Sequence, residues 1–75
     1  MPRPKLDVRA IRERQHMTQV QFSERFGVNL FTLRDWENER YPPSGPARVL
    51  LIVIDKEPAA VISALEEPPA LVKAV

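Results

Sequence analysis

Residues 18–37, TQVQFSERFGVNLFTLRDWE, have the pattern of two short helices joined by a turn, and this stretch decides the fold. Thr18 begins a Thr-x-x-Gln sequence, which is the capping box that opens a helix. Phe22 and Phe26 are four residues apart, so they share one face of that helix and are expected in the core. Gly27 predicts the end of the helix, because glycine readily adopts the left-handed conformation that closes many helices.

A second helix is predicted from Asn29, a favoured N-cap residue, to about Glu39. Its apolar stripe consists of Leu33 and Trp36, with Val28 entering the core just before it, while its other face is polar. Two short helices with a glycine in the turn between them form the helix-turn-helix arrangement. In that arrangement the second helix enters the major groove of DNA.

One further helix is predicted on each side of this motif. Asp7 caps the first helix of the chain, which runs through about Gln15. Ser44 caps a helix that has a proline in its first turn and extends to Lys56. Its run 49–54, VLLIVI, has no polar face, so periodicity alone also allows a buried strand, but the capped start and the length favour a helix. A helix that is apolar all round must be covered by the core or by a second copy of the chain.

A fifth helix is predicted to begin at Glu57-Pro58 and to stop at Pro68-Pro69. Val61, Ile62 and Leu65 are expected to face inward from it. The chain is therefore predicted to be all-α, with five helices and no strand. Its expected parts are an extended arm at residues 1–6, a helix-turn-helix domain at 7–67 and a tail at 68–75 that is a candidate part of a dimer interface.

The composition excludes several kinds of site. The 75 residues include no cysteine, which excludes disulfides, thiolate metal sites and thiol nucleophiles, and the single histidine excludes a histidine cluster. No pair of carboxylates is expected to face each other, and no serine has a base near it in a motif. The longest apolar run falls far short of the roughly 18 residues that a membrane span needs. We therefore expect a cytoplasmic binding domain without metal, cofactor, membrane partner or enzymatic activity.

The charge is distributed unevenly along the chain. Residues 1–48 carry nine Lys and Arg against six Asp and Glu, whereas residues 49–75 carry two against four. A basic first part and an acidic last part suggest that one end meets a polyanion, although ordinary solvated surface explains the pattern equally well. Eight of the eleven cations are arginine, which favours bidentate contacts with phosphates and bases.

With these residues in place, residues 6–55 resemble the phage-repressor-like, or xenobiotic-response-element, helix-turn-helix family, which implies a lambda-repressor-like fold. Residues 8–65 further resemble HigA-like antitoxins and the C-terminal domain of MqsA-like antitoxins of bacterial type II toxin–antitoxin modules. The strings that carry this second resemblance are VRAIRER, MTQVQFSERFGV, TLRDWE, GPARVLL, VIDKEPAAV and AL. Two features depart from these relatives: the cysteine-rich zinc domain of MqsA-like proteins is absent, and Glu39 occupies a position where glycine is usual.

The candidate DNA-binding residues follow from their chemistry and from the matched positions. Gln19 is expected to donate to a phosphate, and Arg34 to bind guanine through two hydrogen bonds. Leu30 and Phe31 cannot hydrogen-bond, so we expect them to contact thymine methyl groups or, alternatively, another protein. The alternative to guanine recognition for Arg34 is that its charge is solvated or pairs within the helix. The other candidates are Asn29 and Thr32 at base edges, Asp35 at a cytosine amino group or as a repulsive charge, and Arg40 and Arg14 at the phosphate backbone.

Arg12 and Glu37 have a structural role in this interpretation. In the resembled family an arginine of the first helix and the acid at the end of the recognition helix form a partly buried ion pair, and those positions are Arg12 and Glu37 here. Such a pair orients helices more surely than it adds stability.

These observations predict a repressor that binds a palindromic operator on double-stranded DNA as a homodimer. One short recognition helix contacts too few base pairs for specificity in a genome, whereas a two-fold dimer places two such helices about 34 Å apart. The antitoxin resemblance implies control of its own operon in the bacterial nucleoid and a RelE/HigB-like toxin as partner. The alternatives are a solitary or phage-type repressor without a toxin, and a helical protein-interaction module.

Overall fold

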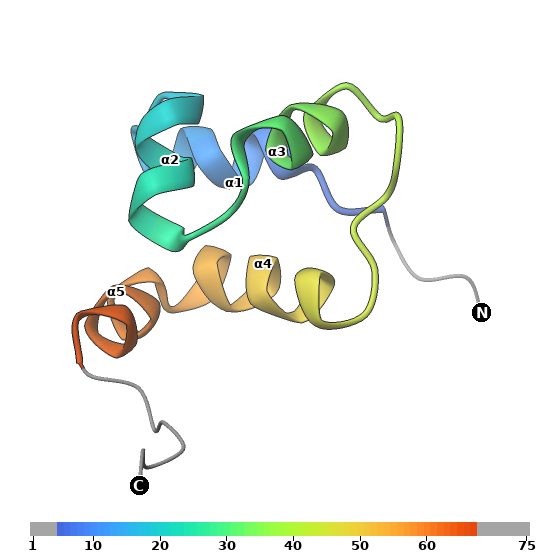
Figure 1. The fold of residues 1–75 in the computed structure, drawn as a ribbon. Coiled ribbons are helices and arrows are strands. Elements are labelled where there is room, and N and C mark those ends of the chain that lie inside the picture. The colour runs from blue at the N-terminus through green and yellow to red at the C-terminus, as the bar shows by residue number, and fades with distance from the viewer. Residues whose placement is uncertain (1–4, 68–75) are drawn as a thin grey trace, which may run out of the picture.

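The computed structural model describes residues 5–67, and this range contains five helices and no strand (Figure 1). The prediction of an all-α chain of five helices is confirmed. The predicted tail at 68–75 and residues 1–4 of the predicted arm lie outside the described residues. The helices are α1 (Val8–Arg14), α2 (Gln19–Phe26), α3 (Leu30–Glu37), α4 (Pro46–Lys56) and α5 (Pro58–Glu66).

Local chemistry starts the first three helices and ends α2 as predicted. The Asp7 side chain accepts from the N–H of Ala10, and Thr18 forms the complete capping box at α2. Gly27 closes α2 with a φ of 68°, in the left-handed region. The Asn29 side chain accepts from two backbone N–H groups of the first turn of α3.

The boundaries of α3 and α4 differ from the prediction. The N-cap of α4 is Gly45 and not Ser44, and no side chain caps this helix. Pro46 is the first helical residue, so the capping position falls on Gly45, whose φ of 56° is unfavourable for serine. Helix α3 ends at Glu37, two residues early, and Glu39 then adopts a φ of 61°. This position is thus left-handed, although it is occupied by a residue with a side chain.

The core lies between the α1–α3 layer and the pair α4 and α5, which run beneath it (Figure 1). Helix α4 packs on α1, and α5 packs on α2. The apolar residues of the core that have no exposed surface are Phe22, Leu33, Leu51 and Ile54. No helix within residues 5–67 combines the length and the apolarity needed to cross a bilayer.

Two predictions about buried apolar residues, one in α4 and one in α5, hold only in part. The apolar run of α4 is covered on one side only: Leu51 and Ile54 are buried, whereas Val49, Ile52 and Val53 are exposed. In α5, Val61 is buried but Leu65 is 57% exposed and does not face inward as predicted. Leu65 lines a hollow together with Gly27, the residue at which α2 has ended and which carries no side chain.

Candidate nucleic-acid interface

Helix α3 is held by the two phenylalanines of α2 and by the turn between the helices. The Phe22 and Phe26 rings are tilted against each other with centroids 4.8 Å apart, and Leu33 of α3 is fully buried in the same cluster. The hydroxyl of Ser23 donates to the Val28 carbonyl. This contact binds α2 to the turn and leaves α3 with one face seated in the core and one face outward.

An ion pair between α1 and the end of α3 fixes the orientation of α3 further. Arg12 donates from Nε to Glu37 Oε2 at 2.7 Å and from Nη2 to Oε1 at 2.9 Å. The Glu37 side chain has no exposed surface, and that of Arg12 is 15% exposed. Burial alone would raise the pKa of Glu37, but hydrogen bonds from Arg12, Gln19 and Arg9 outweigh it and lower the pKa below its usual value. Glu37 is therefore a carboxylate at neutral pH, and the pair implied by the family resemblance is present.

The outward face of α3 carries three of the residues expected to contact bases. Phe31 is 70% exposed, and Thr32 and Arg34 are exposed beside it. The guanidinium carbon of Arg34 lies 5.9 Å from the centroid of the Phe31 ring, a cation–π contact. Leu30 is only half-buried, and the oxygen of the Asn29 side chain is occupied as the helix cap. Asn29 can therefore offer DNA only its amide N–H groups.

Gln19 connects the buried ion pair to this outward face. It is the first residue of α2, and its side-chain Nε2 lies 3.4 Å from Glu37 Oε1. Its Oε1 accepts from Nε of Arg34 at 3.3 Å. The structure thus brings together Gln19, Arg34 and Phe31, three of the residues predicted to bind DNA.

The remaining candidate cations each lie close to an acid. Arg14 donates to Asp55 of α4 at 2.8 and 3.1 Å, so it is bound to the fourth helix and not held beside α3. Arg40 lies 4.0 Å from Asp35, and both of these side chains are at least partly exposed. A phosphate contact by either arginine must compete with these exposed pairs, which are weak in water.

Sequence reasoning missed the contribution of Arg9. Its Nε donates to Glu37 Oε1 at 3.4 Å, so two arginines of α1 face the same carboxylate. Arg9 and Arg12 are three residues apart and share a helix face, and this spacing is the signal that identifies the second arginine.

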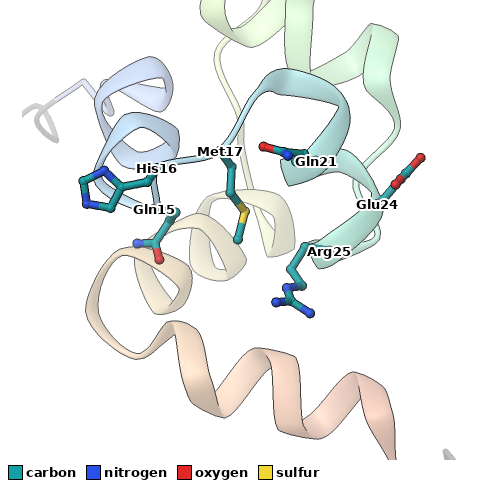
Figure 2. Close-up of a pocket in the computed structure, with 6 residues that line it drawn as sticks. All are labelled: Gln15, His16, Met17, Gln21, Glu24 and Arg25. Carbon is teal, nitrogen blue, oxygen red and sulfur yellow. The ribbon is translucent and has the colours of Figure 1, made fainter.

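A hollow on the described surface lies away from this face of α3. It has a volume of about 480 Å³ and is lined by Gln15, His16, Met17, Gln21, Glu24 and Arg25. Figure 2 shows the Met17 and Arg25 side chains extending toward α4 and α5. The titratable side chains that line it, His16, Glu24 and Arg25, are all exposed. Within residues 5–67 no group of three or more His, Asp or Glu side chains can hold a metal ion.

Both the sequence and the fold match known proteins. Residues 8–47 match a family model described as helix-turn-helix. The chain is also similar to a protein from Agrobacterium tumefaciens whose crystal structure is described as that of a helix-turn-helix, XRE-family-like protein. The two share 41% sequence identity with a TM-score of 0.75, over 79% of this chain and 95% of that one. No protein among the curated sequences matches the chain.

Proposed function

This chain belongs to the XRE-type helix-turn-helix family of DNA-binding transcriptional regulators, and we propose that it is a dimeric repressor and the antitoxin of a type II toxin–antitoxin module. The observation that carries the DNA-binding part is the outward face of α3, where Phe31, Thr32 and Arg34 are exposed on a helix seated by Leu33 and Glu37. Neither an enzymatic activity nor a cofactor is part of this proposal.

Helix α3 enters the major groove in this proposal, and its exposed side chains contact base edges. Arg34 binds the O6 and N7 atoms of a guanine, which contributes roughly 1–3 kcal/mol of discrimination against other bases. Phe31 contacts a thymine methyl group, because an aromatic ring offers no hydrogen bond.

DNA selection followed by titration tests this assignment. An operator is selected from random duplexes, and binding is measured at several salt concentrations for wild type, Arg34→Ala and Arg25→Ala. Arg25 is an exposed arginine of α2 that lines the hollow away from α3, which makes it a matched control for the lost charge. We expect the logarithm of affinity to fall linearly with that of salt concentration, and only Arg34→Ala to lose base preference.

If wild type binds no duplex, the exposed Phe31 favours the alternative of a protein-interaction module, since a bare aromatic ring at 70% exposure also suits a protein partner. If it binds DNA but Arg34→Ala keeps its base preference, the assignment of Arg34 is wrong.

The dimer is supported by the uncovered side of α4. Val49, Ile52 and Val53 lie three and four residues apart and form one exposed apolar stripe. In a two-fold dimer the stripe of one copy packs against the same stripe of the other copy. Such a dimer places two recognition helices on one face of the DNA, about 34 Å apart. We expect sedimentation to show a dimer for wild type at tens of micromolar and a monomer for Ile52→Glu. A monomeric wild type, with and without operator, contradicts the dimer.

The antitoxin role is supported by the resemblance of residues 8–65 to HigA-like and MqsA-like antitoxins. It predicts that a gene beside this one encodes a RelE/HigB-like toxin, and that both lie under the repressed promoter. We expect expression of the neighbouring gene alone to stop growth of the host bacterium, and co-expression of this chain to restore it. Growth that is unaffected by the neighbour favours a solitary or phage-type repressor, and such a repressor still binds the operator.

A further inference from the structure

Arg34 is held from two sides although it is exposed. Its Nε–H donates to Oε1 of Gln19 at 3.3 Å, and its guanidinium lies over the Phe31 ring. A free arginine side chain has many rotamers and loses conformational entropy when it becomes fixed. The two contacts restrict those rotamers before any DNA is present.

The buried carboxylate of Glu37 decides which way the Gln19 amide points. A carboxylate can only accept hydrogen bonds, so the Gln19 NH₂ group must be the end that faces Glu37. The amide oxygen is then directed to the opposite side, where it meets Nε of Arg34. Both bonds are longer than the 2.9–3.0 Å typical of such contacts. Each is weak alone, and the position of Arg34 depends on the Gln19 and Phe31 contacts together.

We propose that Gln19 is a positioning residue for base recognition, which transfers the fixed orientation of Glu37 to the guanidinium of Arg34. This inference rests on the proposed function, because it concerns how Arg34 meets a base. With Nε occupied by Gln19, the two terminal nitrogens of Arg34 remain for the O6 and N7 atoms of guanine. The second N–H of the Gln19 amide stays available for a phosphate, so positioning and backbone contact are compatible.

The positioning role and a simple phosphate contact predict different results for Gln19→Met. Methionine has a similar length and no group that can replace the two hydrogen bonds of Gln19. Loss of a phosphate contact weakens binding to all sequences alike. Loss of positioning reduces affinity for the duplex with the guanine by about two- to tenfold more than it reduces affinity for duplexes without it.

A double-mutant cycle on DNA measures this difference. Wild type, Gln19→Met, Arg34→Ala and the double variant are titrated with the selected operator and with a duplex that lacks the guanine recognised by Arg34. We expect Gln19→Met to reduce the preference for guanine when Arg34 is present and to have no effect on it when Arg34 is alanine. An equal loss on both duplexes and in both backgrounds overturns the positioning role.

A measurement without DNA separates this inference from the proposed function. In nuclear magnetic resonance spectra of the free protein, the Arg34 Nε–H is expected to exchange slowly with water in wild type and rapidly in Gln19→Met. Gln21→Met is the matched control, because it makes the same chemical change in α2 and removes a cap but has no contact with Arg34. If Gln19→Met leaves the exchange of Arg34 unchanged, the inference fails, whatever the protein binds. Failure of wild type to bind DNA, with the exchange difference present, refutes only the proposed function.

Discussion

The ion pair between Arg12 and Glu37 gives the sharpest prediction about stability. In the variant Arg12→Met, the methionine retains the bulk of the side chain but removes the charge and all three of its hydrogen bonds. Two of these go to Glu37, at 2.7 and 2.9 Å, and one goes to the carbonyl of Met17 at 2.9 Å. The remaining partners of Glu37 are then Arg9 and Gln19, each at 3.4 Å.

The expected loss follows from the burial of Glu37. Its side chain has no exposed surface, so the carboxylate without Arg12 cannot be solvated by water. Breaking one side of such a pair costs about 3–5 kcal/mol. A domain of this size has a free energy of unfolding of about 4–11 kcal/mol, so the single change removes a large part of it. In the double variant Arg12→Met/Glu37→Leu no charge is left unpaired, and we expect a loss of only about 1–2 kcal/mol, in part from the unpaired Met17 carbonyl.

Urea unfolding at neutral pH measures both variants. Far-UV circular dichroism reports the helices, and the fluorescence of Trp36, the single tryptophan, reports packing against the core. The protein concentration must be the same in all experiments, since the stability of a dimer depends on it. Arg12→Lys serves as a milder variant if Arg12→Met does not fold. Its expected loss of unfolding free energy lies between those of Arg12→Met and the double variant, because lysine keeps the charge but cannot form two parallel hydrogen bonds to the carboxylate.

Two outcomes would refute this reasoning. One is a loss below about 1 kcal/mol for Arg12→Met, which would mean that water or other donors replace the arginine at Glu37. The other is a double variant as unstable as the sum of its two single changes, which would mean that the two side chains act independently.

Three further predictions concern acid stability, the left-handed residues and the helix caps. Burial raises the pKa of Glu37, but its hydrogen-bond donors outweigh burial and lower the pKa below the usual value of about 4.3. Its stabilising effect is therefore fully present above that usual value and is lost as the pH falls from there through the lowered pKa of the folded state, so acid titration should show the advantage of wild type over Glu37→Gln shrinking as the pH falls below about 4.3. Glu39→Gly should raise the unfolding free energy by about 0.5–1 kcal/mol, because glycine removes the strain of a positive φ. Gly27→Ala should lower the unfolding free energy by about 1 kcal/mol, because it introduces that strain. Chemical denaturation that shows the same change in unfolding free energy for both variants would contradict this reasoning. Asn29→Ala should lower the melting temperature through the loss of about 1 kcal/mol of capping, whereas Ser44→Ala, which removes no cap, should leave it nearly unchanged.

The sequence alone predicted the five helices because their boundaries depend on local chemistry. A capping side chain and the N–H groups it binds lie within three residues of each other, as at Thr18 and Asn29. The same is true of Gly27, whose left-handed conformation needs no distant partner. The prediction failed at Ser44. Pro46 is the first residue of α4, so the capping position is Gly45, one residue after Ser44.

The partners of the charged side chains were less predictable. Arg14 is predicted to contact a phosphate, and in the structure it pairs with Asp55, a residue 41 positions away. The pair of Arg12 and Glu37 was anticipated only through the resemblance to a family, since nothing in residues 25 positions apart indicates that they meet. The same applies to the contact between Gln19 and Arg34.

By itself the sequence determined where the helices lie, which side chains cap the first three and which face of the recognition helix is polar. Only the tertiary structure decided which side of α4 is covered, because the run 49–54 is apolar all round and has no period to distinguish Leu51 and Ile54 from Val49, Ile52 and Val53. It likewise decided that Gln19 links the buried Glu37 to Arg34. Capping and helix periodicity act over three or four residues, whereas burial and ion pairing depend on which helices meet, and that follows only when the whole chain is packed.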